Sequence, residues 1–168
     1  LRATAAHSTM VVDDINSSEI WKNGGLGRGV KNVKCSRREI DGRSVLEATS
    51  DGYNGLFDLE HRRFLMLSVD GTELLGEDLL IGTGGKRFTV RFHLHPNVQA
   101  TLIQNGNAVL LKPRRGRGWK LVSTNQEVFL EQSVYVDEGV RYRRTQQIVI
   151  PGEILGRGAA VKWRLIQI

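Results

Sequence analysis

Histidines are the side chains of this sequence best suited to chemistry, because an imidazole titrates near neutral pH and its neutral form binds metal ions. The sequence has four: His7, His61, His93 and His95. In a strand, His93 and His95 would lie on one face together with Arg91. A fixed guanidinium beside them disfavours a metal cation, so we favour a half-exposed polar strand face there over a metal site.

His61 opens the run His61-Arg62-Arg63, which leads into an apolar strand. Alternation puts His61 and Arg63 on the face of the following leucines, and buried polar side chains need hydrogen-bond partners. Asp58, Glu60 or a carboxylate on the next strand could supply them. We favour a structural hydrogen-bonded cluster, and we keep His61, Arg62 and Arg63 as tentative substrate-binding residues.

Other catalytic arrangements find little support. Ser8 follows His7 directly, and adjacent residues on a strand face opposite ways, which excludes a local Ser–His pair. Cys35 is the only cysteine, so the chain has no internal disulfide and no cysteine metal cluster. The glycine-rich run 25–29 precedes a predicted strand rather than a helix, which argues against a dinucleotide-binding loop.

The basic residues are unevenly distributed. The formal net charge is +6, and no acidic residue lies between Asp78 and Glu127. That stretch holds eight cations: Lys86, Arg87, Arg91, Lys112, Arg114, Arg115, Arg117 and Lys120. Such a zone attracts polyanions, although a solvated loop face is equally compatible with it. We take Arg114, Arg115 and Arg117 as further tentative substrate-binding residues.

The elements that must position these side chains are strands. Helical periodicity is nearly absent, and runs rich in Val, Ile, Phe, Leu and Thr recur between Gly-, Asn- and Asp-containing turns. The predicted strands are His7–Asp13, Val30–Ile40, Ser44–Thr49, Leu56–Val69, Thr72–Leu80, Lys86–His95, Gln99–Gln104, Ala108–Lys112, Trp119–Ser123, Val128–Val136, Arg141–Ile150 and Ala159–Ile168. They predict an all-β fold: one domain, residues 1–168, forming a large two-sheet antiparallel β-sandwich of roughly a dozen strands.

Three dipeptides predict tight two-residue hairpins: Asp41-Gly42, Asp70-Gly71 and Asn105-Gly106. Asp-Gly and Asn-Gly dipeptides both tolerate the positive φ that such turns require. The strands around residues 64–67 and 147–150 are apolar on both sides, which predicts inner positions in a layered pair of sheets.

The N-terminal motif is the most specific feature: Arg2-Ala3-Thr4-Ala5-Ala6-His7-Ser8-Thr9, then Val12-Asp13, then Ser17-Ser18-Glu19-Ile20-Trp21. It resembles the C-terminal region of the heparinase II/III-like family of polysaccharide lyases. Later blocks, such as His61-Arg62-Arg63 and Gly76-Glu77-Asp78, extend the resemblance over nearly the whole chain.

The resemblance implies that the family enzymes have two domains with different roles. Family enzymes pair an N-terminal (α/α) toroid with a C-terminal β-sandwich and cleave uronic-acid-containing polysaccharides by β-elimination. The catalytic tyrosine belongs to the toroid, so we expect no catalytic residue here and no activity of the chain alone. We expect a fragment of a longer bacterial protein, in which this domain packs against the toroid and lines the substrate cleft. The compartment implied is the periplasm or cell envelope, with the cytoplasm as the alternative.

The resemblance also implies that His7 is a ligand of a divalent metal, zinc or calcium, in the full-length parent. The other ligands would lie upstream, so no metal is expected in the chain alone. The alternative is that His7 is a packed strand residue. One departure concerns Ser50, where relatives often carry a histidine before Asp51-Gly52-Tyr53.

Two other functions stay open. A stand-alone carbohydrate-binding module for acidic glycans would display aromatics, and only Trp21 and Trp119 lie near predicted loops. A nucleic-acid binder is suggested by charge alone, and only Trp119 is placed to stack bases. We therefore expect an acidic polysaccharide as partner through the parent protein and no nucleic acid. We also expect no membrane insertion, since no apolar run approaches the roughly 20 residues of a spanning helix.

Overall fold

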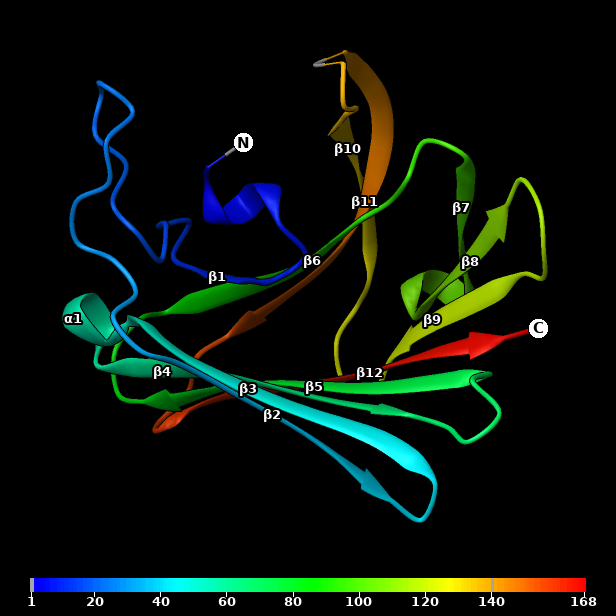
Figure 1. Cartoon of the computed structure of the whole chain (residues 1–168), viewed down its shortest axis with the longest axis horizontal. Coiled ribbons are helices and arrows are strands. Elements are labelled where there is room, and N and C mark those ends of the chain that lie inside the picture. Colours follow the sequence, from blue (N-terminus) through cyan, green and yellow to red (C-terminus); the bar gives the residue numbers. More distant parts are fainter. Residues whose placement is uncertain (1, 140) are drawn as a thin grey trace.

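Strands dominate the computed structural model, which describes residues 2–139 and 141–168, without the side chain of Gln104. The strands are β1 (Met10–Val12), β2 (Val33–Ile40), β3 (Arg43–Tyr53), β4 (Leu59–Leu67), β5 (Glu73–Gly82), β6 (Arg87–His93), β7 (Val98–Ile103), β8 (Ala108–Pro113), β9 (Trp119–Ser123), β10 (Phe129–Val136), β11 (Tyr142–Glu153) and β12 (Gly158–Gln167). The short helices are η1 (Thr4–Ala6), α1 (Asn54–Phe57) and η2 (Gln104–Gly106). The predicted all-β sandwich is confirmed (Figure 1).

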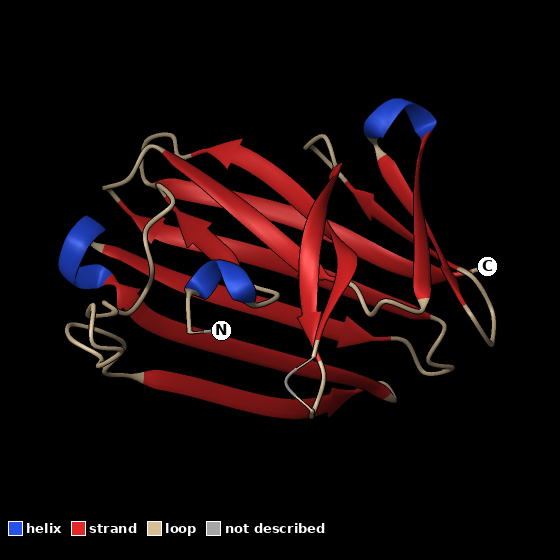
Figure 2. Cartoon of the chain, turned by 90° about the horizontal axis from the view of Figure 1, so that it is seen from above, coloured by secondary structure: helices blue, strands red, loops and turns tan. Residues whose placement is uncertain are grey.

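The strands form two antiparallel sheets. The smaller has the order β1-β6-β11-β10, and the larger has the order β2-β3-β4-β5-β12-β9-β8-β7. Figure 2 shows the small sheet lying across the large one, with the long β2–β5 strands beneath it. The strands at residues 64–67 and 147–150 are β4 and β11, and both are interior strands, as predicted.

The core lies between the two sheets and is filled largely by alternate side chains of the inner strands, while every residue of the edge strand β2 is exposed. Phe88 and Val90 of β6 and Ile148 and Ile150 of β11 are almost completely buried. The larger sheet contributes the fully or nearly fully buried Leu80, Val109, Leu121, Val161 and Trp163. All these residues belong to one hydrophobic cluster, which fixes how the sheets pack.

Only one predicted two-residue hairpin forms as expected. Asp41 and Gly42 have φ of 50° and 74° and join Ile40 to its partner Arg43. The connection around Asp70 is longer, because the Asp70 carboxylate accepts hydrogen bonds from Thr72 N and from the Ser68 hydroxyl and shapes a wider loop.

The turn at Asn105-Gly106 is also longer than predicted. Both residues have positive φ, 53° and 89°, as the dipeptide suggests. They lie within η2, however, and the paired residues flanking the connection are Ile103 and Ala108. The hairpin itself is confirmed.

Several predicted strands are too long, among them Val30–Ile40, which yields only β2 from Val33 onward. The segment His7–Asp13 yields only β1, because Thr4 bonds Asn16 Oδ1 through its amide and Ser17 through its hydroxyl, which holds the preceding turn η1 outside the sheet. Leu56 lies in α1 rather than in a strand. His95 lies beyond the end of β6 and precedes Pro96, which has no N–H to donate to a ladder. No helix in the described part of the chain is long and apolar enough to span a bilayer.

Candidate functional site

A pocket of about 280 Å³ lies beside the N-terminal turn, at the end of β1. It brings together His7, from the segment after η1, and His61, at the start of β4. Tyr53 and Ser50 of β3 also line it, and Ser50 lies in register opposite His61. The position where relatives often carry a histidine is therefore part of the pocket wall.

Behind this pocket lies a buried cluster centred on Asp78, whose side chain is 0% exposed. His61 Nε2 lies 2.9 Å from Asp78 Oδ1. Arg63 donates Nε–H to Oδ1 at 2.7 Å and Nη2–H to Oδ2 at 3.0 Å, a bidentate pair. Trp163 donates its indole N–H to Oδ2 at 3.0 Å. The predicted structural cluster around His61 and Arg63 is present, with its partner on the next strand, β5.

This cluster fixes the orientation of the His61 ring. An ionised carboxylate only accepts hydrogen bonds, so Nε2 carries the proton shared with Asp78. In a neutral ring, Nδ1 is then the nitrogen with a lone pair. The side chain of His61 is 12% exposed, so the ring can present an acceptor at the pocket wall.

Hydrogen bonds beside the pocket also join the two sheets. Arg63 donates Nη1–H to the carbonyl oxygen of Ser8 at 2.6 Å. Tyr53 donates its hydroxyl to the carbonyl oxygens of Ile15 at 3.1 Å and Met10 at 3.4 Å. Residues of β3 and β4 therefore hold the segment around β1, and with it His7, against the larger sheet.

Burial and hydrogen bonding act oppositely on two acids here. Burial disfavours ionisation of Asp78, but the His61 hydrogen bond and the Arg63 charge outweigh it, so the pKa of Asp78 lies below its usual value. Burial raises the pKa of Tyr53 to about 12, against smaller opposing effects. The site thus contains an ionised Asp78 and a Tyr53 that stays protonated at neutral pH.

His7 is exposed and lies outside any strand, so its alternative prediction as a packed strand residue is wrong. In residues 2–139 and 141–168, no group of three His, Cys, Asp or Glu side chains is arranged to hold a metal ion. His61, its neighbour in the pocket, already uses Nε2 on Asp78. His7 as a metal ligand stays a prediction.

The predicted substrate-binding residues do not converge. Arg62 lies on β4 between His61 and Arg63, and it pairs instead with Glu47 at 3.6 Å and Glu60 at 3.4 Å. The exposed Arg114, Arg115 and Arg117 lie in and around the β8–β9 connection. Strands β5 and β12 separate β4 from β9 in the sheet, so these arginines form a second, distinct region.

The predicted alternation around His93 is confirmed at two positions, since Phe92 and Leu94 pack against the core. Both ring nitrogens of His93 have partners: Nδ1 lies 2.9 Å from Ser133 Oγ, and Nε2 lies 3.0 Å from the Ala5 carbonyl oxygen. His95 instead packs edge-on against Tyr135, with ring centroids 4.9 Å apart. The two histidines therefore serve different local contacts.

Known proteins place this architecture in a family. The family profile described as "Heparinase II/III-like, C-terminal" matches residues 1–164. The chain belongs to this family. The heparinase II/III-like domain is also 32% identical, over 149 residues, to the "FtsZ-localized protein C" of Caulobacter vibrioides, covering 82% of the chain and 26% of that protein.

Solved structures share the fold. The domain matches heparan sulfate lyase HepC from Pedobacter heparinus with a TM-score of 0.79 at 16% identity, over 99% of this chain and 24% of that one. It matches a structure of heparinase III with a TM-score of 0.69 at 13% identity, over 96% of this chain and 23% of that one. The domain thus spans about a quarter of the length of these proteins and shares the fold of that part of them.

Proposed function

We propose that this domain is the C-terminal β-sandwich of a polysaccharide lyase that cleaves uronic-acid-containing polysaccharides by β-elimination. The observation that carries the proposal is the family match over residues 1–164, together with a sandwich that superposes on lyase domains along 99% of the chain. β-Elimination needs a base for the proton next to the uronate carboxylate and a group that neutralises that carboxylate. We propose that the catalytic residues lie in an α/α toroid outside this chain.

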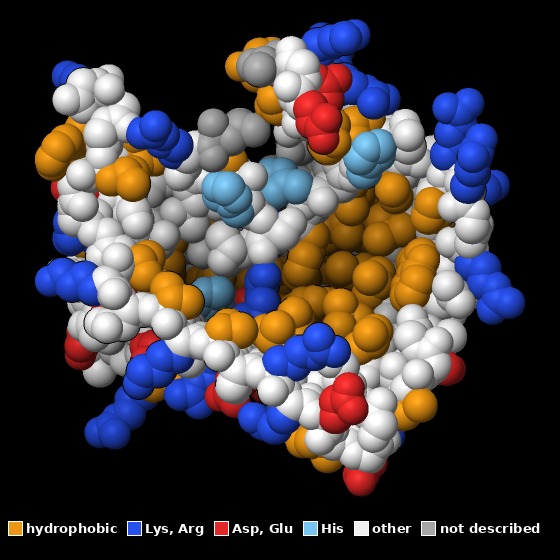
Figure 3. All heavy atoms as spheres, in the orientation of Figure 1, with side chains coloured by type: hydrophobic (Ala, Val, Ile, Leu, Met, Phe, Trp, Pro, Cys, Tyr) orange, Lys and Arg blue, Asp and Glu red, His pale blue; other side chains and the backbone are white. Residues whose placement is uncertain are grey.

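The role we propose for the domain is to pack against that toroid and to line the substrate cleft. A wide hollow with a hydrophobic floor supports this role: it lies between the small sheet and the β7–β9 end of the large sheet (Figure 3). Both sheets carry partly buried hydrophobic side chains that pack against the core: Phe92 and Leu130 in the small sheet, and Leu65, Leu74, Val98, Trp119 and Leu165 in the large sheet. An apolar surface of this kind is typical of a protein interface.

We propose a further role for the pocket at the N-terminal turn, also within the full-length protein. We propose that His7 binds a divalent metal, zinc or calcium, jointly with ligands from residues outside this chain. An imidazole suits zinc, and His7 is exposed at the pocket, where a further segment could reach it. The Asp78 cluster would hold His61 beside that segment.

The parent protein tests this proposal directly. Incubated with heparin, heparan sulfate or alginate, the full-length protein should generate the ultraviolet absorbance of an unsaturated uronate. The 168-residue chain alone should generate none, because the catalytic residues that we propose lie outside it. A parent that cleaves none of these and no other uronic-acid polymer would refute the proposal, as would cleavage by the isolated chain.

A second candidate is favoured by the 32% identity to a protein named as FtsZ-localized, which exceeds the 13–16% identity to the lyase structures. The domain would then belong to a protein that localises with FtsZ, in place of or beside a role on polysaccharides. Imaging a fluorescent fusion of the full-length protein together with FtsZ tests this. A uniform distribution, or one confined to the cell envelope away from FtsZ, would remove this candidate.

A further inference from the structure

Three neighbouring cavities surround β7, the edge strand of the larger sheet. They measure about 390, 590 and 470 Å³, and the first two share Pro96 and Gln99. The first and third share Asn97 and Arg114, and the second and third share Val98. We call these three neighbouring cavities together the β7 groove.

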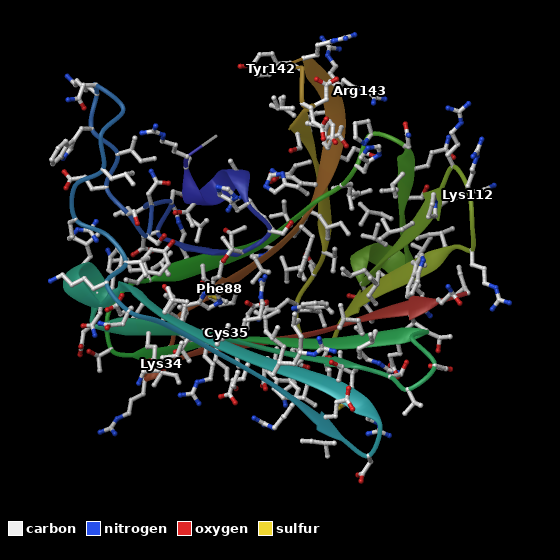
Figure 4. The ribbon with its side chains drawn as sticks, viewed as in Figure 1. Lys34, Cys35, Phe88, Lys112, Tyr142 and Arg143 are labelled. Carbon is white, nitrogen blue, oxygen red and sulfur yellow. The ribbon has the colours of Figure 1, made fainter. Side chains whose placement is uncertain are left out.

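Cations line the groove from two separate elements. Lys112 and Arg114 come from the end of β8 and the loop after it, and Arg144 comes from β11. Arg143, next in β11, donates to Asn97 Oδ1 at 3.4 Å, and the Arg114 amide donates to the Asn97 carbonyl oxygen at 2.9 Å. Figure 4 shows Arg143 and Lys112 on opposite sides of the gap between β11 and β8.

In the part of the chain that the structure describes, no carboxylate lines the groove to neutralise these cations. Among the described residues, none that lines the three cavities is acidic, and Lys112, Arg114 and Arg144 are exposed without an ion-pair partner. Elsewhere in the chain, Arg63, Arg87 and Arg164 each contact an Asp or Glu. An unneutralised cationic groove favours an anionic ligand.

The uncharged polar side chains that line the groove indicate which class of anionic ligand it binds. Asn97, Gln99 and Gln146 bring amides into the groove, and Thr101 brings a hydroxyl. Amides and hydroxyls both donate and accept, which suits sugar hydroxyls. No Trp, Tyr or Phe side chain of the described residues lines the three cavities, so the groove has none of the aromatic platforms on which nucleic-acid bases stack.

We infer that the β7 groove binds an acidic oligosaccharide through its sulfate or carboxylate groups, as a binding site separate from the pocket at His7 and His61. The choice of a saccharide ligand rests on the proposed function. The groove holds a segment of the polymer by charge-assisted hydrogen bonds from Lys112, Arg114 and Arg144, and the amides select for hydroxyl-bearing units.

The test is calorimetric titration of the 168-residue chain with heparin and alginate oligosaccharides at several salt concentrations. Heparin carries sulfates and alginate carries only carboxylates, so the two probes separate the anionic groups. Binding of either probe supports the inference and should weaken as salt rises. Binding of neither overturns it.

Two matched double variants locate the site. Lys112→Gln with Arg144→Gln removes one lysine and one arginine from the groove and should weaken binding about tenfold or more. Lys34→Gln with Arg37→Gln removes the same charges from the edge strand β2, whose residues are all exposed, and should change affinity by less than about twofold. Equal losses in the two variants would mean that net charge alone attracts the ligand and would overturn the inference. Circular dichroism confirms that both variants keep the strand signal.

A third variant separates saccharide from nucleic acid. Asn97→Ala with Gln99→Ala should weaken oligosaccharide binding and leave the affinity for a single-stranded DNA of equal charge unchanged. DNA binding as tight as that of heparin, and lost in the Lys112 and Arg144 variant, would identify a nucleic-acid groove and overturn the inference. Lyase activity of the parent is a separate readout: activity without groove binding refutes only this inference, and groove binding without activity refutes only the proposed function.

Discussion

Trp163 donates its indole N–H to Asp78 Oδ2 over 3.0 Å, and both side chains are buried between the sheets. Asp78 lies on β5, between β12, which carries Trp163, and β4, which carries His61 and Arg63. One carboxylate therefore links three adjacent strands through side chains. The orientation of His61 at the pocket depends on a residue that does not line that pocket.

Neutralising Asp78 should destabilise the domain strongly. Asp78→Asn keeps the side-chain volume but leaves the Arg63 guanidinium, only 19% exposed, without its counter-charge. Breaking one partner of a buried pair typically costs about 3–5 kcal/mol. Urea unfolding should show a loss of that order in the free energy of unfolding.

Glu77→Gln is the matched control, since Glu77 neighbours Asp78 but pairs with the exposed Lys162 at 3.5 Å. Exposed pairs contribute about 0–1 kcal/mol, so this variant should unfold close to the wild type. If both variants lost equal stability, the cluster would not hold β4, β5 and β12 together as argued.

Acid should weaken the fold through carboxylates with lowered pKa values. Hydrogen bonds from the Ser68 side chain, and then from Thr72, lower the pKa of Asp70 from 3.8 to about 2. A lowered folded-state pKa gives stability that is fully present above the unfolded value and lost as pH falls through the folded value. The free energy of unfolding should therefore decrease between pH 3.8 and about 2. Asp78, whose pKa is also lowered, adds to this loss.

The Asp70→Asn variant isolates one contribution, because Asp70 is exposed and its substitution leaves the core intact. Urea unfolding at successive pH values should give a shallower decline for this variant than for the wild type below pH 3.8. Parallel declines would show that the Asp70 loop does not contribute to acid sensitivity.

Local patterns in the sequence were sufficient to predict two packed antiparallel sheets of about a dozen strands, but not which strands form which sheet. Runs of β-forming residues between turn signals identified every strand, and runs that are apolar on both sides identified β4 and β11 as interior. Strand ends were less predictable where side chains compete with the ladder. The Asp70 carboxylate widens one loop and the Thr4 contacts exclude η1 from the sheet, and neither effect follows from residue type alone.

The site was predicted only in part for a similar reason. The need of His61 and Arg63 for a carboxylate followed from a polar pair within an apolar stripe. The choice of Asp78 depended on strand pairing, which places Arg63 opposite Asp78 in the β4–β5 register. An aspartate on the apolar face of β5 was the available signal. Arg144 lines one cavity beside β7, and Lys112 and Arg114 line a neighbouring one, and this arrangement depends on how the sheets pack, which no local pattern encodes.

Gly76 should tolerate no side chain, because the Trp163 ring lies directly across it. A β-carbon at Gly76 would lie 2.1 Å from Trp163 Cζ2, and the two residues are paired in the β5–β12 register. Gly76→Ala should cost about 1–3 kcal/mol through overpacking and shift the Trp163 fluorescence.

Gly55→Ala is the corresponding control in the exposed helix α1, where a β-carbon would lie 3.7 Å from the Arg28 side chain. It should leave stability unchanged or raise it by up to about 1 kcal/mol, since alanine lowers the conformational entropy of the unfolded chain relative to glycine. The midpoints of urea unfolding compare the stabilities of the Gly76→Ala and Gly55→Ala variants. A neutral Gly76→Ala would mean that Trp163 can move, and the geometry of the Asp78 cluster would then not be fixed.

Tyr53 should remain a neutral hydrogen-bond donor far above physiological pH. Burial raises its pKa to about 12, and its hydroxyl donates to the Ile15 and Met10 carbonyl oxygens. Tyr53→Phe removes these bonds and should cost about 0.5–1.5 kcal/mol. The difference in ultraviolet absorbance between the wild type and this variant isolates the Tyr53 phenolate, which should form only as the pH approaches 12.

The sign of the associated stability change is opposite to that of the aspartates. A raised folded-state pKa gives stability that is present below the unfolded value of 10.0 and lost as pH rises through the folded value of about 12. The wild type should lose stability across that window, and Tyr53→Phe should lose less. Ionisation of Tyr53 near pH 10.0 would show that its hydroxyl is open to water. The segment around β1, which carries His7 to the pocket, would then not be anchored by Tyr53.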